Sequence, residues 1–250
     1  MSRVEDAGLN ASAPPQQRWL DGWIVRYLAG KARRARCINA VASGCLSLDD
    51  KLALAAEVYR EADLPMIFRL NRFTQPAMLD TELARRGYGL VDSTRVMVLG
   101  ALPGKPVRPM PMGCHFSKLS GPDFADSVGA LRGSPAAHRQ SHALRLHHSP
   151  VPYQGYAIRS DADDTVLACG QFAREADLVG LYDVHTLESA RGQGLAGLLC
   201  ERLLSISALQ GSKVGYLQVE CENALALKTY RRLGFSDAYR YHYRERPAGI

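Results

Sequence analysis

A short glycine-rich stretch, Arg191 to Ala196, has the composition of a phosphate-binding turn. The residues before it, 178–186, form a strand-like apolar run, and apolar residues recur at helical spacing from Leu195 to Ile206. The stretch therefore joins a strand to the N-terminus of a helix. Backbone N–H groups in the first turn of a helix lack intrahelical partners, and the helix dipole adds partial positive charge there. Because Gly194 lets the backbone approach a ligand closely, this turn could bind a pyrophosphate.

A second candidate stretch runs from Asn223 to Phe235 and follows another strand-like run, 214–221. Asn223 can N-cap a helix here, and Gly234 can end it. Tyr230 lies on the same helical face as the small and apolar residues of this stretch, which is the usual position of a core aromatic. The pattern alone therefore leaves Tyr230 open as a packing residue or as a group that faces a ligand.

Taken together, the two stretches resemble the GNAT superfamily of acyl-CoA-dependent N-acyltransferases. The match is to the family's R/Q-x-x-G-x-G/A loop, here Arg191, Gly194 and Ala196, followed by its N-x-x-A-x-x-x-Y-x-x-x-G-F helix, here 223–235. It covers residues 116–244. The resemblance implies an α/β fold of layered α+β type, with a mixed, mostly antiparallel sheet flanked by helices. It also implies direct transfer of an acetyl group from acetyl-CoA, the cosubstrate, to an amine in a ternary complex.

The resemblance assigns a role to each residue of the two stretches. Val184 and Thr186 would pair with the pantetheine arm through their main chains. Tyr230 would protonate the departing thiolate, and Asn223 would contact pantetheine unless it serves only as the N-cap. The pyrophosphate would be held by Arg191 and by the backbone N–H groups of Gly192, Gln193, Gly194, Leu195 and Ala196.

The general base stays open at this point. The family often places a carboxylate four residues before the Val184 position, and this chain has Gly180 there. Asp183 and Glu220 are the nearby carboxylates, one on each strand, and side-chain alternation decides which of them faces the cleft. Asp183 could equally be a structural acid, and solvent could remove the proton. The missing carboxylate also leaves a non-catalytic alternative, an acyl-CoA-binding sensor or regulatory module.

The order of predicted elements suggests two GNAT-like halves. Residues 1–17 are polar and read as a flexible tail, 18–101 as a degenerate half, the proline-rich 102–113 as a linker, and 114–250 as the acetyltransferase domain. A helix that ends in Gly-aromatic before a strand occurs at 82–88 and again at 229–235. This alignment puts Leu83 opposite Tyr230 and Pro76 opposite Asn223, and the first half has no glycine-lined turn. We therefore expect one bound coenzyme, with the first half shaping the acceptor side.

Composition narrows the remaining function classes. Hydrophobic residues make up 46% of the chain and charged residues 22%, as in globular proteins, and the net charge of +6 suits a polyanionic ligand. No apolar run predicts a membrane span or a secretory signal, and no nucleic-acid motif accompanies the basic residues. The six cysteines lack a C-x-x-C pair, and four histidines on a predicted helix lack an H-E-x-x-H pattern: His138, His142, His147 and His148. We expect a cytoplasmic protein without metal that acts on a small-molecule or peptide amine. A homodimer is left open.

Overall fold

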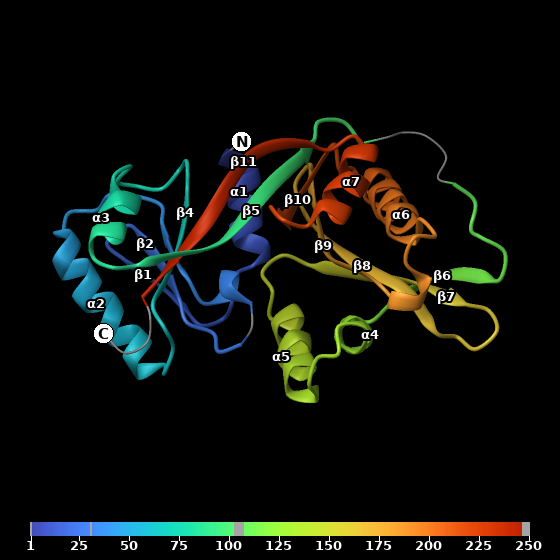
Figure 1. The fold of residues 1–250 in the computed structure, drawn as a ribbon, viewed down its shortest axis with the longest axis horizontal. Helices are drawn as coiled ribbons and strands as arrows, with labels where there is room; N and C mark the ends of the chain where they lie inside the picture. The colour runs from blue at the N-terminus through green and yellow to red at the C-terminus, as the bar shows by residue number, and fades with distance from the viewer. Residues whose placement is uncertain (1, 31, 103–107, 247–250) are drawn as a thin grey trace. The chain divides into compact units, whose positions relative to one another are not determined.

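The computed structural model describes residues 2–30, 32–102 and 108–246, and the chain divides into two compact units. Unit 1 comprises residues 3–11 and 96–238, and unit 2 comprises residues 12–95 and the chain from Tyr239 onward. Strands β5 (Gly89–Leu99) and β11 (Ser236–Glu245) contribute residues to both units (Figure 1). Each unit is therefore assembled from segments that are far apart in the sequence.

Unit 1 is built on a mixed sheet in the order β5-β10-β9-β8-β7-β6. Neighbouring strands from β6 to β9 are antiparallel, whereas β9 and β10 are parallel and are joined through helix α6, Leu195–Leu209. The strands are β6 (Cys114–Leu119), β7 (Tyr153–Ser160), β8 (Val166–Glu175), β9 (Leu178–Thr186) and β10 (Val214–Glu220).

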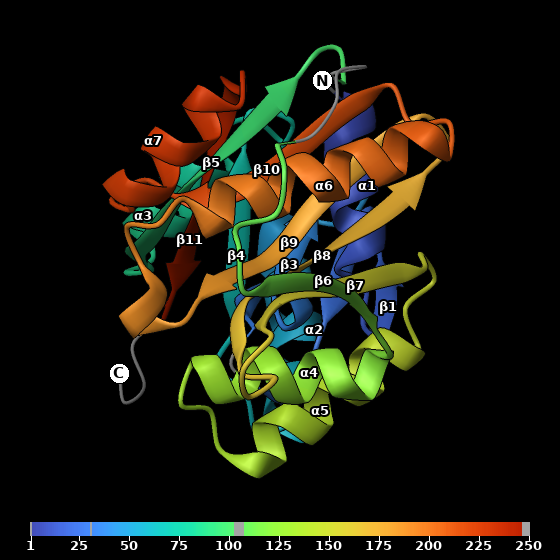
Figure 2. The same cartoon turned by 90° about the vertical axis from the view of Figure 1, so that its right-hand side faces the viewer.

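Helices lie on both faces of this sheet (Figure 2). Helix α6 covers one face and packs Leu199 and Leu203 against Phe172 and its neighbours. Helices α4 (Gly121–Leu131) and α5 (Ala136–His147) lie on the opposite face, where Phe124 is fully buried. Helix α7, Ala224–Arg232, follows β10. The strands of unit 1 thus have one apolar layer on each side.

The N-terminal segment is a helix and not the flexible tail that the sequence suggested. Helix α1, Ser2–Ala11, buries Val4, Ala7 and Ala11 at helical spacing, and its glycine approaches β10, because a Cβ at Gly8 would lie 2.8 Å from the Gln218 amide. The Tyr153 hydroxyl donates to the carbonyl of Ala11 over 2.6 Å. The polar composition of the segment is misleading because small residues make up much of its buried face, with Val4 and Leu9 as its larger apolar members.

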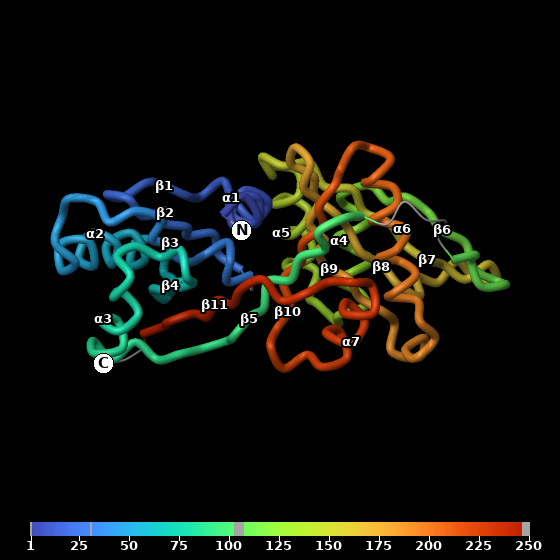
Figure 3. Tube along the Cα trace, turned by 90° about the horizontal axis from the view of Figure 1, so that it is seen from above, coloured from blue at the N-terminus to red at the C-terminus, as the bar shows by residue number. Residues whose placement is uncertain are grey.

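Unit 2 has a similar order of strands on a smaller sheet, β1-β2-β3-β4-β11, but its first two strands follow each other without the two helices that separate β6 from β7. Strands β3 and β4 are parallel and are joined through helix α2, as β9 and β10 are joined through α6. Figure 3 traces the chain through these elements. Its core contains Trp23, Phe68, Leu79 and Leu83, all fully buried. The remaining elements are β1 (Gln17–Leu20), β2 (Trp23–Arg26), η1 (Arg33–Ala35), β3 (Ile38–Ala40), α2 (Leu48–Glu61), β4 (Ile67–Asn71) and α3 (Leu79–Arg85).

The proline-rich segment expected as a linker lies partly outside the described residues, which omit 103–107. Its described part belongs to unit 1. Leu102 and Met110 pack against the main core of that unit, and Arg202 Nη2 donates to the carbonyl of Arg108 over 3.2 Å. The boundaries also differ from the expected halves, because residues 96–101 fall in unit 1 and the chain after Ala238 falls in unit 2.

Candidate active site

A cleft of 750 Å³ opens where strands β9 and β10 separate. The parallel register joins Leu178–Leu181 of β9 to Val214–Leu217 of β10, and over the described residues it goes no further. Residues from the end of β9, the start of α6 and one face of α7 line the cleft. Its volume lies within the range of small-molecule and cofactor sites. The cleft lies entirely within unit 1.

The glycine-rich turn forms one end of this cleft. Gly194 is the N-cap of α6, in the left-handed conformation at φ 77°, and no side chain caps the helix. Gly192 also has positive φ, and a Cβ built there would have no atom within 4 Å. The backbone at the start of α6 therefore borders the cleft, with the Arg108 side chain beside it, as an anion site at a helix N-terminus requires.

A β-bulge decides which residues of β9 face the cleft. The register between β8 and β9 shifts between Cys169 and Gln171, and Asp183 adopts φ 52°. Two residues of β9, Asp183 and Val184, therefore lie opposite Gly170. Val184 turns toward the α6 face and lines the cleft together with Thr186.

Asp183 turns instead toward α4 and α5. Its carboxylate accepts a hydrogen bond of 3.0 Å from Arg132 Nη1 and one of 2.7 Å from Gln171 Nε2, and His142 Nε2 lies 3.4 Å away. Burial alone would raise the pKa of Asp183, but His142 and the Arg132 and Arg145 charges outweigh it and hold the pKa well below its usual range. Asp183 is therefore ionised at neutral pH, held in an ion pair, and absent from the cleft lining.

His185 follows Val184 and is among the residues that line the cleft, although no sequence pattern selected it. Burial and the nearby Arg132 and Arg191 charges lower its pKa, and a hydrogen bond with the backbone of Leu131 opposes them. The imidazole is therefore mostly neutral at pH 7, the form that can accept a proton. Its only signal in the sequence is its place on the strand next to Val184.

Tyr230 and Asn223 both line the cleft from α7. The Tyr230 ring packs edge-on against Phe235 at 6.1 Å between centroids, and burial, with a contribution from Cys200, raises the pKa of its hydroxyl. Asn223 does cap α7, because its side chain accepts from Ala226 N over 3.1 Å. Glu220 is exposed at the end of β10 and does not line the cleft.

The space beside Gly180 is filled by two tyrosines. A Cβ at Gly180 would lie 2.5 Å from the Tyr216 ring and 2.6 Å from the Tyr182 ring. The two hydroxyl groups are 2.9 Å apart and share a hydrogen bond. A carboxylate at this position would therefore collide with the pair, so the glycine is required by the packing around it.

Charge in the cleft is predominantly positive. Arg108, Arg191 and Arg232 line it, against Glu201 as the single carboxylate among its described lining residues. The sequence predicted Arg191 alone of these four, because Arg108 lies in the expected linker and reaches the site only through the fold. No cysteine lines the cleft, and burial raises the pKa of the nearby Cys200 thiol to about 12. The lining therefore favours an anionic ligand and offers no thiol nucleophile.

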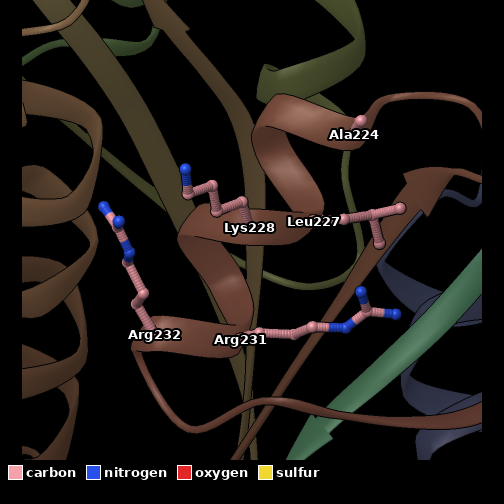
Figure 4. A pocket seen from close by; sticks show the side chains of 5 residues that line it. All are labelled: Ala224, Leu227, Lys228, Arg231 and Arg232. Atoms are coloured by element: carbon pink, nitrogen blue, oxygen red, sulfur yellow. The ribbon is translucent and has the colours of Figure 1, made fainter.

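Two further hollows lie in unit 1. One, of 680 Å³, is on the α4 and α5 face, where Phe124, Leu144 and Gly155 border it and Gln171 connects it to Asp183. The other, of 470 Å³, lies along α7, where Arg231 and Arg232 extend to opposite sides of the helix (Figure 4). No cluster of three potential metal ligands occurs among the described residues, and none of the described helices is long and apolar enough to cross a membrane.

The structure brings together most of the residues that the sequence predicted. Of the ten expected coenzyme-site and acid residues, Gln193 is the one that does not line the cleft. The nine that do are Val184, Thr186, Arg191, Gly192, Gly194, Leu195, Ala196, Asn223 and Tyr230. The two expected carboxylates, Asp183 and Glu220, both lie outside the lining.

Comparisons with known proteins agree on one fold. Residues 165–244 match the family model described as "Probable histone acetyltransferase Rv0428c C-terminal". A mycothiol acetyltransferase of Clavibacter michiganensis is 32% identical over 166 residues, which are 58% of this chain and 49% of that protein, so the chain spans about half the length of this relative.

Solved structures extend the likeness to the whole chain. A GCN5-related N-acetyltransferase from Kribbella flavida superposes with a TM-score of 0.68 at 18% identity, covering 99% of this chain and 96% of that one. A tandem GNAT protein from the clavulanic acid biosynthesis pathway superposes with a TM-score of 0.66 at 15% identity, covering 81% of this chain and 70% of that one. The mixed sheet flanked by helices is therefore a GNAT fold.

Proposed function

Because the chain belongs to the GNAT superfamily of N-acetyltransferases, we propose that it transfers an acetyl group from acetyl-CoA to a primary amine by direct attack in a ternary complex. The observation that carries this proposal is the cleft between β9 and β10. It leads from the uncapped N-terminus of α6 to the hydroxyl-bearing face of α7, so one ligand can reach both the phosphate-binding turn and Tyr230.

The donor would lie along this cleft with its pyrophosphate at Gly192 and Gly194. The pantetheine arm would occupy the space between the separated strands, where the main chains of Val184 and Thr186 can pair with its amides as an added strand does. Main-chain donors next to the bulge can polarise the thioester carbonyl as negative charge develops on its oxygen. The thioester would then lie beside α7.

Tyr230 is proposed as the acid that protonates the departing thiolate. Its raised pKa keeps the hydroxyl protonated across the neutral range, which is the state in which a proton donor must begin. No described residue forms a hydrogen bond with this hydroxyl, so its proton is available to a ligand in the cleft. Core packing of the ring is compatible with this role, because the ring packs against Phe235 while the hydroxyl is left for a ligand.

The proton of the attacking amine is assigned here to His185 or to water. Asp183 is committed to Arg132 and has its pKa held well below the neutral range, and Glu220 does not reach the cleft. His185 lines the cleft and is mostly neutral at pH 7. A His185→Gln variant should lower kcat/KM and remove the acid limb of its pH profile. A limb that persists in this variant would assign the proton to water.

The acceptor amine is proposed to approach from the α4 and α5 face. The 680 Å³ hollow there is connected through Gln171 to Asp183, the residue next to the cleft-lining Val184. The acceptor itself is open, because the matching family model is described as a histone acetyltransferase and one relative as a mycothiol acetyltransferase. A peptide lysine and a small-molecule amine are therefore both in scope.

The proposal is tested by measuring thiol release from acetyl-CoA with a panel of amines: amino acids, polyamines, amino sugars and lysine peptides. If the chain is an enzyme, one CoA thiol should be released for each amine acetylated. Mass spectrometry of the product checks that the amine carries the acetyl group. The alternative, an acyl-CoA sensor, is favoured by the absence of a carboxylate at Gly180. Tight coenzyme binding without thiol release for every amine would support the sensor, and absence of binding would refute both functions.

A further inference from the structure

Arg108 lies directly over the N-terminal turn of α6. A Cβ built at Gly197 would be 3.3 Å from Arg108 Nη2, and one built at Gly194 would be 3.8 Å from Nη1. The guanidinium therefore occupies the rim of the cleft, on the same side as the uncapped backbone N–H groups. The segment that carries it was expected to serve only as a linker.

Two contacts hold Arg108 in this position. Its Nε lies 2.9 Å and 3.1 Å from the two carboxylate oxygens of Glu201, a residue on α6 itself. Its carbonyl accepts a hydrogen bond from Arg202, and Met110 anchors the following residues in the core. Main chain and side chain are thus both fixed, although the side chain is about half exposed at 55%.

The contact with Glu201 leaves the outer part of the guanidinium free. Glu201 engages the Nε edge, and no described residue accepts a hydrogen bond from Nη1 or Nη2. Both amino groups lie next to the glycines at the start of α6. Arginine is suited to phosphate because it presents several donors in a planar fork.

The electrostatics of this arrangement favour an anion. A cation near a helix N-terminus faces the positive end of the helix dipole, which is unfavourable unless a negative group lies between them. Glu201 balances one charge, but Arg191 and Arg232 add two more to the same cleft. A dianionic pyrophosphate between Arg108 and the α6 N–H groups would offset the positive charge of the guanidinium and accept hydrogen bonds from both groups.

We propose that Arg108 binds the pyrophosphate of acyl-CoA, so that the segment before β6 completes the coenzyme site. This inference rests on the proposed function, since it names a further residue of the same donor site. Glu201 is a positioning residue here: it orients the guanidinium and touches no ligand. The site therefore selects donors that carry a pyrophosphate over phosphate-free thioesters.

The test compares Arg108→Gln with Lys118→Gln, which removes one positive charge from an exposed position on β6 away from the cleft. Calorimetry with CoA should show an affinity loss of about tenfold or more for Arg108→Gln and little change for Lys118→Gln. Glu201→Gln should show a smaller loss. Thermal unfolding of each variant checks that the fold is intact.

Dephospho-CoA identifies the phosphate that is bound, because it lacks the 3′-phosphate and keeps the pyrophosphate. If Arg108→Gln loses the same factor of affinity for CoA and for dephospho-CoA, the proposal is supported. A loss that disappears with dephospho-CoA overturns it in favour of the 3′-phosphate, and wild-type affinity of Arg108→Gln overturns it altogether. If the wild-type chain fails to bind CoA, the proposed function itself fails, which separates the two inferences.

Discussion

The turn before α6 in unit 1 and the turn before α2 in unit 2 occupy equivalent places, each between two parallel strands, but their anion sites are in opposite states. The N–H groups at Gly192 and Gly194 face an open cleft. In unit 2 the Asp21 carboxylate accepts hydrogen bonds from Cys45 N, at 2.9 and 3.0 Å, and from Leu46 N, at 2.9 Å. An internal carboxylate thus takes the place that a phosphate could occupy.

Further contacts fix this carboxylate in unit 2. A Cβ at Gly44 would lie 2.2 Å from it, and the buried Lys51 ammonium is 3.0 Å from Asp21 Oδ2. The N–H groups of Cys45 and Leu46, together with Lys51, lower the pKa of Asp21, so it stays ionised. The two units share a supersecondary structure, and within the described residues the turn of unit 1 is open to a ligand whereas the turn of unit 2 is filled by Asp21.

The largest expected effect is the loss of the coenzyme site from unit 1 alone. Calorimetry of the wild-type chain should give one CoA per chain, and Gly194→Glu should weaken binding by more than about 100-fold, because the acid fills the turn and repels the phosphates. Gly87→Glu is the matched control: Gly87 also has positive φ, at 83°, and open space, but lies in unit 2. Binding of two CoA per chain, or equal losses of CoA affinity in both variants, would show that the two units do not differ in coenzyme binding.

The next largest effect is expected from removing the Tyr230 hydroxyl on α7, which has no counterpart on α3. Tyr230→Phe keeps the ring and removes the hydroxyl, so turnover should fall by about 100-fold while the melting temperature changes little. The counterpart in unit 2 is Leu83, which is fully buried and has no hydroxyl to lose. Parallel losses of turnover and melting temperature in Tyr230→Phe would show that the hydroxyl is structural.

A smaller effect is expected when the internal anion of unit 2 is removed. Asp21→Ala leaves Lys51 buried without its carboxylate partner, and the melting temperature should fall by roughly 10 °C. Since the folded-state pKa of Asp21 is lowered, its stabilisation is present above the unfolded pKa of about 3.9 and is lost as the pH falls through the folded value. The wild-type chain should therefore lose more stability than the variant below about pH 4.

Sulfate gives this experiment a second readout. If Asp21 substitutes for a bound anion, sulfate should stabilise Asp21→Ala against heat more than it stabilises the wild-type chain, because the vacated N–H groups become available. Equal stabilisation of both proteins would mean that the turn before α2 binds no external anion.

The smallest effect concerns Gly180, where unit 1 departs from the usual family pattern. Gly180→Ala forces a methyl group against Tyr182 and Tyr216 and should cost about 1–3 kcal/mol in the free energy of unfolding. Gly89→Ala in β5 has ordinary contact distances, with the nearest atom at 3.8 Å, and is the control in urea unfolding. An unchanged free energy of unfolding in Gly180→Ala would mean that Tyr182 and Tyr216 move aside, and that a carboxylate could be introduced at this position.

Local pattern was enough to predict the two stretches that line the cleft. A helix start needs only a glycine turn and apolar spacing within about ten residues, so Arg191–Ala196 and the Asn223 cap could be read directly. Strict alternation from Val179 and Leu181 would place Asp183 on the α6 face. The bulge adds one residue and sends Asp183 to the opposite face, and a bulge of this kind leaves no signature in a sequence.

Other parts of the site depend on contacts between distant residues. Arg108 reaches the cleft through Glu201, 93 positions away, and nothing near Arg108 signals it. The occupied turn in unit 2 likewise joins Asp21 to Cys45 and Leu46. The sequence shows a lone Gly44 before α2, and the internal carboxylate beside it appears only in the structure.

The division of the chain into units has a consequence for synthesis and for dissection of the protein. Helix α1 precedes the residues of unit 2 in the sequence but belongs to unit 1, whose other residues begin at Val96, while unit 2 includes strand β11 from Tyr239 onward. Neither unit therefore has all of its residues until synthesis has passed Ala238. A single cut in the proline-rich segment would separate unit 1 from its first helix and unit 2 from its last strand, so each fragment would lack a piece carried by the other.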